Sequence, residues 1–285
     1  GGVLEGLNKS IDIAEKDYRG LVVGNQADNF SVGANLAMVM MMAVEQDWYE
    51  LNMAIAMFQQ TSMKLRYSSI PVIAAPFGMT LGGGCEFSMH ADKIVAAAET
   101  YIGLVEVGVG LIPGGGGTKE FALRALKGTL PDDVKTNHLR NYFMNIATAK
   151  VATSAWEAKQ IGILTDKDII VVNKDRQIAE AKRQAIFLDE LGYTPPVPEK
   201  VKVLGNEAMG MFYVGTDQMV AGGYASEHDR KIANKIGYVM TGGNLSEQTE
   251  VSEQYLLDLE REAFLSLCGE RKTLERIGGM LKTGK

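Results

Sequence analysis

Two acidic residues, each beside a run of glycines, are the positions where this chain could do chemistry. Glu86 closes the segment Gly82-Gly83-Gly84-Cys85-Glu86, and Glu106 follows after a further twenty residues. Glycine has no Cβ and tolerates positive φ, so the backbone N–H groups around it can approach a ligand closely. A carbonyl bound there would meet backbone donors and two carboxyl groups, which suits acid–base chemistry on a stabilised oxyanion.

The backbone amides of Gly83 and Ala34 are the candidate donors. Gly83 precedes a helix predicted to begin near Cys85, and Ala34 follows Gly33 at the start of another predicted helix. The N-terminal end of a helix carries partial positive charge and suits a developing negative oxygen. Spacing alone does not show that the two amides face one atom.

Plainer interpretations exist for the same residues. The glycine run alone is typical of a tight turn between a strand and a helix, and Glu86 alone is typical of a first-turn glutamate that complements the helix dipole. The combination with Glu106 favours a functional site. His90 is predicted to be structural, and no metal site is expected, because His138 and His228 lack ligand spacing with it. The glycine runs also match neither phosphate-binding fingerprint, since Pro113 stands where a dinucleotide motif needs glycine.

Strands and helices alternate in the pattern that must position these residues. Short apolar runs bounded by glycine or proline predict strands, and amphipathic stretches predict helices. Such alternation predicts an α/β fold with mainly parallel strands, because each return to the same direction needs a crossover. The predicted strands are 20–24, 71–75, 93–97 and 169–172, and the predicted helices are 34–44, 47–66, a helix from about 85, 117–126, 154–160 and 175–191.

The chain is predicted to divide near its proline-rich segment at 194–198 into an α/β core, residues 1–194, and a helical C-terminal subdomain, residues 195–285. A helix through Leu256 is expected to end at Gly269, and no strong strand is predicted beyond residue 198. The chain opens on a helical pattern, so the core is expected to lack a first strand.

Composition narrows the possible partners and surroundings. A hydrophobic share of 46% excludes a disordered chain, and a net charge of -6 argues against a nucleic-acid partner. The longest apolar stretch, residues 34–44, is shorter than the roughly 20 residues that cross a bilayer. Its methionines are predicted to fill the core, with an acyl-chain pocket as the alternative. Cys85 and Cys268 lie far apart in apolar segments, which favours a reducing, cytoplasmic location.

Three segments resemble the crotonase, or enoyl-CoA hydratase/isomerase, superfamily in order and spacing. The similarity covers roughly residues 1–175 and implies a ClpP/crotonase-like spiral core. The segments are Phe30-Ser31-Val32-Gly33-Ala34-Asn35, then residues 71–86 from Pro71 to Glu86, then Glu106 with residues 111–118 from Leu111 to Thr118.

This resemblance implies a site in which the amides of Ala34 and Gly83 form an oxyanion hole, with Glu86 as base and Glu106 as proton donor. Two glutamates imply addition of water to a 2-enoyl-CoA. Isomerisation of an enoyl-CoA, other acyl-CoA enolate chemistry and non-catalytic binding of acyl-CoA remain the alternatives. The resemblance further implies substrate-binding roles for Gly33, Gly82, Gly84, Gly108, Pro113 and Gly114.

The C-terminal helical segment is similar to the end of bacterial proteins that fuse a 3-hydroxyacyl-CoA dehydrogenase to such a hydratase. The resemblance implies a dehydrogenase part in the same longer polypeptide, with NAD serving that part and no cofactor bound by this segment. Coenzyme A enters only as part of the substrate, and self-association is compatible with the family. The chain departs from the family pattern at Asp28-Asn29 and Asn35; Lys64, Arg66 and Lys119 are the cations considered for the coenzyme A phosphates.

Overall fold

The computed structural model describes residues 2–127, 129, 130 and 132–284. Its packing groups the chain into two compact units, each assembled from three separate segments. The domain boundary at residue 194 stays a prediction. The first unit contains Gly1–Ala34, Ala56–Leu104 and Val151–Val197, and the second contains Asn35–Ile55, Val105–Lys150 and Pro198–Lys285.

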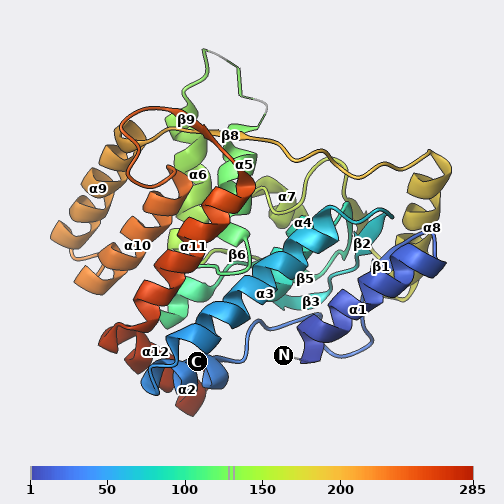
Figure 1. The fold of residues 1–285 in the computed structure, drawn as a ribbon, viewed down its shortest axis with the longest axis horizontal. Coiled ribbons are helices and arrows are strands. Elements are labelled where there is room, and N and C mark those ends of the chain that lie inside the picture. Colours follow the sequence, from blue (N-terminus) through green and yellow to red (C-terminus); the bar gives the residue numbers. More distant parts are fainter. Residues whose placement is uncertain (1, 128, 131, 285) are drawn as a thin grey trace. The chain divides into compact units, whose positions relative to one another are not determined.

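A parallel sheet forms the centre of the first unit (Figure 1). Its strand order is β1-β2-β4-β7, and every neighbouring pair is parallel, as the alternating pattern predicted. Short β-branched runs form these strands because both faces of the sheet are covered. The strands are β1 (Leu21–Val23), β2 (Val72–Ala74), β4 (Lys93–Ala97) and β7 (Ile169–Val171).

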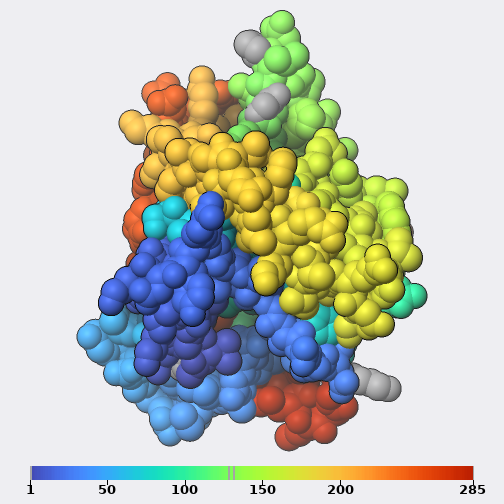
Figure 2. All heavy atoms as spheres, turned by 90° about the vertical axis from the view of Figure 1, so that its right-hand side faces the viewer, coloured from blue at the N-terminus to red at the C-terminus, as the bar shows by residue number. Residues whose placement is uncertain are grey.

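Helices cover the two faces of this sheet. On one face, Ala181 and Ala185 of α8 (Gln177–Glu190) pack on Ile73 and Val95. On the other face, Ile11 of α1 (Gly2–Asp17) and Leu65 of α3 (Trp48–Arg66) pack on Val72. Figure 2 shows the outer side of α1, in dark blue, at the surface. The sheet is therefore the middle layer of the first unit.

A second, smaller sheet carries the glycine-rich turn. It has the order β3-β5-β6, with β3 (Gly78–Leu81) parallel to β5 (Thr100–Gly103) and β5 antiparallel to β6 (Val151–Ala152). The sequence analysis predicted no strand at residues 78–81, where the structure has β3. Glycine and methionine are weak strand signals, and pairing with β5 decides the conformation there. α4 (Gly83–His90) follows, and α7 (Ala155–Gln160) begins after its N-cap Ser154.

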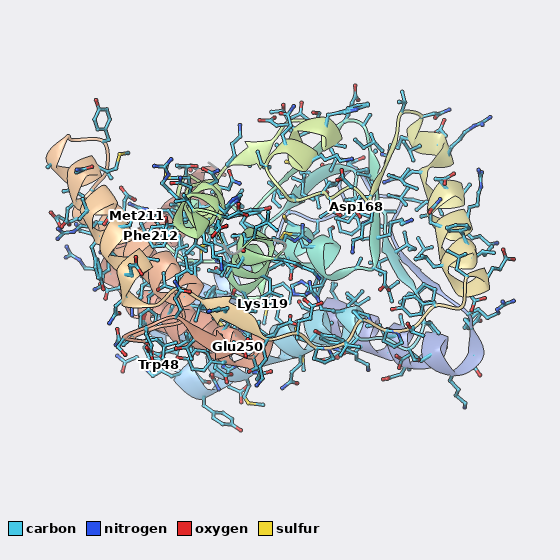
Figure 3. All side chains as sticks on the ribbon, turned by 90° about the horizontal axis from the view of Figure 1, so that it is seen from above. Trp48, Lys119, Asp168, Met211, Phe212 and Glu250 are labelled. Atoms are coloured by element: carbon cyan, nitrogen blue, oxygen red, sulfur yellow. The ribbon has the colours of Figure 1, made fainter. Side chains whose placement is uncertain are left out.

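The second unit is mainly helical. α10 packs against α5, α6, α9 and α11, and Phe143 of α6 stacks on Phe212 of α9 with ring centroids 4.2 Å apart. Phe212 is labelled on α9 in Figure 3. Its helices are α2 (Leu36–Val44), α5 (Gly117–Leu126), α6 (Lys135–Ala147), α9 (Asn206–Ala221), α10 (Glu227–Met240), α11 (Glu253–Cys268) and α12 (Arg271–Thr283), with the short helix η1 (Glu106–Val109).

A two-stranded ribbon in this unit was missed by the sequence analysis. β8 (Val201–Val203) pairs antiparallel with β9 (Thr249–Val251), far along the chain. Each strand has three residues, too few for a period of two to be distinguished from loop. In the part of the chain that the structure describes, no helix combines the length and apolar character needed to cross a bilayer.

Candidate active site

The loop that ends at Ala34 runs beside β3 in the first unit. The Ser31 amide donates to the Met79 carbonyl at 3.1 Å, and the Leu81 amide donates to the Ser31 carbonyl at 2.8 Å. Gly33 then turns the chain with φ of 97°. This pairing brings the segment before Ala34 next to the strand that leads into the glycine run, a proximity that sequence spacing could not give.

Gly83 opens α4 directly after this strand. Gly82 has φ of 54°, a conformation that a residue with a Cβ adopts only at a cost, and it directs the chain into the helix. The first N–H groups of a helix have no partner within the helix. Among the described residues, neither the amide of Ala34 nor that of Gly83 donates a backbone hydrogen bond. This observation is compatible with the predicted oxyanion hole, which stays a prediction.

Two glycines of this turn are needed for close packing. A Cβ on Gly84 would lie 2.6 Å from the Cβ of Ser31, and a Cβ on Gly83 would lie 2.8 Å from Cζ of Phe58. Such distances are shorter than any tolerated contact, so any side chain would push the neighbours apart. Glycine at these positions lets the Ser31 loop and α4 touch.

Glu86 lies in the first turn of α4 and is 1% exposed. Its amide donates to the Gly82 carbonyl at 3.0 Å, so the helix holds it at a fixed distance from the turn. One turn later, the buried His90 ring lies with Nδ1 2.7 Å from the Glu86 carbonyl oxygen. That hydrogen bond supports the structural interpretation of His90.

Glu106 belongs to the second unit, where it begins η1. Its Oε2 atom is buried and has no hydrogen-bond partner among the described residues. Burial raises the pKa of the Glu106 carboxyl to about 7, and the negative charge of Glu260 raises it further. Hydrogen bonds from the backbone amides of Glu106 and Val105 act in the opposite direction and lower this pKa. A carboxyl group that keeps its proton near neutral pH can serve as an acid.

The remaining predicted site residues of this unit follow Glu106. Gly108 is exposed and has open space around its Cα, whereas a Cβ on Gly114 would lie 2.9 Å from the Phe264 ring. Pro113 is buried. Gly114 thus has a packing reason to be glycine, and the substrate-binding roles of all three residues stay predictions.

Glu260 of α11 is a buried acidic residue that the sequence analysis missed. It is 0% exposed, and its carboxylate accepts hydrogen bonds from the backbone amides of Gly116, Thr118 and Lys119 at 2.6, 2.9 and 3.0 Å. A sequence signal for it exists: Glu260 lies on the apolar stripe of α11 formed by Leu256, Ala263 and Leu267.

Lys119 cannot serve as an exposed phosphate ligand. It is 0% exposed, and its Nζ lies 2.9 Å from Glu253 Oε2 and 3.3 Å from Glu120 Oε2. Lys64 is engaged with Asp12 at 2.6 Å, and Arg66 Nη2 donates to the Met89 carbonyl at 3.5 Å. For Lys64 and Arg66, binding of the coenzyme A phosphates stays a prediction.

Two further expectations concerned α2. Asn35 is its N-cap, accepting from the amides of Ala37 and Met38, so this departure from the family pattern has a local structural role.

The prediction that the methionines of this helix fill the core was wrong for Met38 and Met41, which are 44% and 53% exposed. The helix is apolar on nearly all sides, and one of its faces has no covering element among the described residues.

The sequence of the chain is similar to a protein family and to individual curated proteins. Residues 2–129 match the family described as Enoyl-CoA hydratase/isomerase. A Bacillus subtilis (strain 168) protein named "Probable 3-hydroxyacyl-CoA dehydrogenase" is 49% identical over 284 residues, which are 99% of this chain and 36% of that protein. An Idiomarina loihiensis protein named "Fatty acid oxidation complex subunit alpha" is 31% identical over 166 residues, 50% of this chain and 23% of that protein.

The fold is also found in solved structures. A crystal structure of an enoyl-CoA hydratase from Rhodobacter sphaeroides 2.4.1 aligns with a TM-score of 0.67 at 14% identity, covering 99% of this chain and 82% of that one. This similarity confirms the crotonase fold predicted from the sequence. The chain spans about a third or less of the length of the two relatives, which therefore contain much additional sequence.

Proposed function

From the premise that residues 2–129 are a domain of the crotonase superfamily, we propose that this chain hydrates the 2,3 double bond of a 2-enoyl-CoA thioester. The observation that carries the proposal is the turn in the first unit. There, the amides of Ala34 and Gly83 are free of backbone partners, and the buried Glu86 follows within one helical turn. Backbone donors for a developing oxyanion, with a base nearby, are the groups that addition to an unsaturated thioester needs.

The two amides act on the thioester oxygen. As water adds to C3, the electron pair of the double bond moves toward the carbonyl, and negative charge develops on its oxygen. Fixed backbone donors stabilise that charge without reorganisation, and removal of one such donor typically costs about 3 kcal/mol in the transition state. Gly82 and Gly84 hold the turn in place, and Gly33 does the same for the loop before Ala34.

The two glutamates divide the proton transfers. Glu86 takes a proton from water as the C3–O bond forms, and Glu106 gives its proton to C2 as the enolate collapses. The product is a 3-hydroxyacyl-CoA. A proton then passes from Glu86 to Glu106 through solvent, so one water is consumed and neither residue is changed over the cycle.

We propose that the chain acts in fatty-acid β-oxidation as the hydratase segment of a longer polypeptide. The names of the relatives, a 3-hydroxyacyl-CoA dehydrogenase and a fatty acid oxidation complex subunit, support this proposal. NAD would then serve the dehydrogenase part. This segment needs no cofactor of its own, because coenzyme A arrives as part of the substrate. Cys85 and Cys268 are buried and not joined in a disulfide, which supports a reducing, cytoplasmic location. Burial raises the pKa of the Cys268 thiol to about 12, so it is not a nucleophile.

The test uses the natural polypeptide that carries these residues, mixed with crotonyl-CoA in labelled water. Loss of the enoyl absorbance with uptake of label at C3 is expected, and it should be abolished in Glu86→Gln and Glu106→Gln. Movement of a double bond in a 3-enoyl-CoA without label would instead identify an isomerase. Binding of acyl-CoA with no turnover of either substrate would contradict an enzymatic function.

A further inference from the structure

The carboxylate of Glu260 joins a helix of the C-terminal region to the glycine-rich turn after Glu106. It satisfies three amides at the N-terminus of α5, where Gly116 is the N-cap and has no side chain to cap the helix itself. The interaction spans more than 140 residues of sequence. This cap stabilises α5. The backbone between Glu106 and the turn, and the charge of the two carboxyl groups, bear on whether Glu260 also affects Glu106.

The backbone between Glu106 and this turn is held at several points. The Leu111 amide donates to the Glu106 carbonyl at 3.0 Å, Thr273 Oγ1 donates to the Gly110 carbonyl at 2.8 Å, and Arg276 Nη1 donates to the Val107 carbonyl at 3.3 Å. Glu260 fixes the far end of the same stretch. The carboxyl group of Glu106 is therefore carried by a backbone with little freedom.

The two buried carboxyl groups differ in their hydrogen-bond donors. Glu260 accepts three amide hydrogen bonds and feels the charge of Lys119, all of which favour its charged form. Glu106 has one buried oxygen without any donor. Burial raises the pKa of both groups, and two such carboxyls that repel each other share a single proton. The proton belongs on Glu106, because the anion of Glu260 has three amide donors whereas Glu106 Oε2 has none among the described residues.

We propose that Glu260 is a positioning residue for the reaction: its carboxylate clamps the turn after Glu106, and its fixed negative charge keeps the proton on Glu106. This inference rests on the proposed function, in which Glu106 donates a proton to C2. Glu260 lies outside residues 2–129, so the family match does not cover it. The C-terminal helices would then supply part of the acid's environment as well as support.

Other charged groups surround this pair and must be considered in any pH experiment. Lys119 forms ion pairs with Glu253 and Glu120, and Glu120 also pairs with Arg124. On the side of α12, Arg276 pairs with Asp229, and His228 contacts Thr273. Burial, and after it the charge of Arg276, lowers the pKa of His228 below its ordinary value, so His228 must be counted among the groups that titrate near this pair.

Glu260→Gln is the variant that tests the proposal, with Glu253→Gln as its matched control. Glu253 lies seven residues earlier on the same buried stripe of α11, and its Oε2 atom lies 2.9 Å from Lys119 Nζ. Infrared spectra recorded as a function of pH follow the C=O band of protonated Glu106. The band is assigned to Glu106 by its absence from the spectrum of Glu106→Gln. Its midpoint should fall by about one pH unit or more in Glu260→Gln, the size expected for coupled carboxyl groups, and stay unchanged in Glu253→Gln.

An unchanged midpoint in Glu260→Gln would overturn the proposal, and so would an equal fall in both variants. If Glu260→Gln does not fold, Glu106→Gln provides the reciprocal test. With Glu106 neutral, the band of Glu260 should titrate at lower pH, and the absence of that shift would also overturn the proposal. These spectra need no substrate.

Kinetics then separate the inference from the proposed function. For a hydratase, the alkaline limb of kcat should move to lower pH in Glu260→Gln, with KM little changed. A midpoint shift in a protein that hydrates no enoyl-CoA would leave the coupling intact and refute the hydratase. Hydration with an unshifted profile would refute only the role of Glu260.

Discussion

At the scale of single residues, the environment of each carboxyl group sets what it can do. Glu86 is buried one helical turn after Gly83, and among the described residues Glu106 Oε2 is buried without a hydrogen-bond partner. An unpartnered buried polar atom costs about 1–3 kcal/mol and calls for a physical reason. A role for Glu106 in binding or proton transfer is one such reason, and it is the one that the proposed function uses.

Glu86→Gln is expected to lower kcat by roughly 10²–10⁴-fold, the usual contribution of a general base. KM should change little, because the amide keeps the size of the side chain. Steady-state hydration of crotonyl-CoA measures both constants. Glu99→Gln, an exposed position in the same unit, should retain full activity. A Glu86→Gln protein with unchanged kcat would remove Glu86 from the mechanism.

At the scale of elements, close approach between the Ser31 loop and α4 decides the geometry of the turn. The cap of α2 at Asn35 adds a second fixed point directly after Ala34. The cap is a local sequence feature, whereas the contact between Ser31 and Gly84 joins residues distant in the sequence. Both features bear on the position of the Ala34 amide.

Gly84→Ala is expected to destabilise the protein by about 1–3 kcal/mol, since its methyl group would overlap Ser31. Activity should fall further than stability, because the loop bearing the Ala34 amide must move. Gly6→Ala in α1 is the control: its Cβ would meet nothing within 4 Å, and it should stabilise by roughly 0.5–1 kcal/mol. Urea unfolding gives both values. Equal effects of the two substitutions would contradict the packing argument.

Asn35→Ala is expected to cost about 1 kcal/mol of stability, because the amides of Ala37 and Met38 lose their acceptor. Asn35→Asp keeps an acceptor oxygen and should restore the stability. Thermal unfolding of the three proteins tests the role. Identical melting temperatures for all three would show that the cap contributes nothing.

At the scale of the whole molecule, buried carboxyl groups link folding to pH. Glu106 and Glu260 have pKa values raised above those of the unfolded chain, so the folded protein keeps protons that the unfolded protein releases. The free energy of unfolding should therefore fall as pH rises from about 4.5 to about 7. Each unit of pKa difference corresponds to about 1.4 kcal/mol.

The change in unfolding free energy over this range should be smaller in Glu106→Gln than in the natural protein, since the variant has one fewer raised carboxyl group. Urea unfolding at several pH values measures the slopes. Tyr193, which bonds Asp92 in the first unit, offers a comparison through Tyr193→Phe. That change should lower stability without reducing this slope. A natural protein whose stability rises steadily from pH 4.5 to 7 would contradict the raised pKa values.

Local patterns in the sequence determined most of the elements and the crotonase-like fold. β-branched runs and proline boundaries placed β1, β2 and β4, and the glycines with Glu86 and Glu106 led to the prediction of a site that stays a prediction. These elements and motifs can be predicted from the sequence because strand propensity, helix caps and glycine conformation depend on only a few neighbouring residues. Strand β3 and the ribbon of β8 and β9 escaped, since they depend on partners distant in the chain.

Tertiary structure alone decided which distant groups meet. The Ser31 loop reaches β3 through hydrogen bonds across about fifty residues, and Glu260 reaches Gly116 across 144. The apolar stripe of α11 marks Glu260 as a buried acid among the 35 acidic residues, but only the tertiary structure shows that it caps α5. Residues that meet over such distances show no characteristic spacing in the sequence. Their approach depends on all the contacts of the core together, and not on the residues between them.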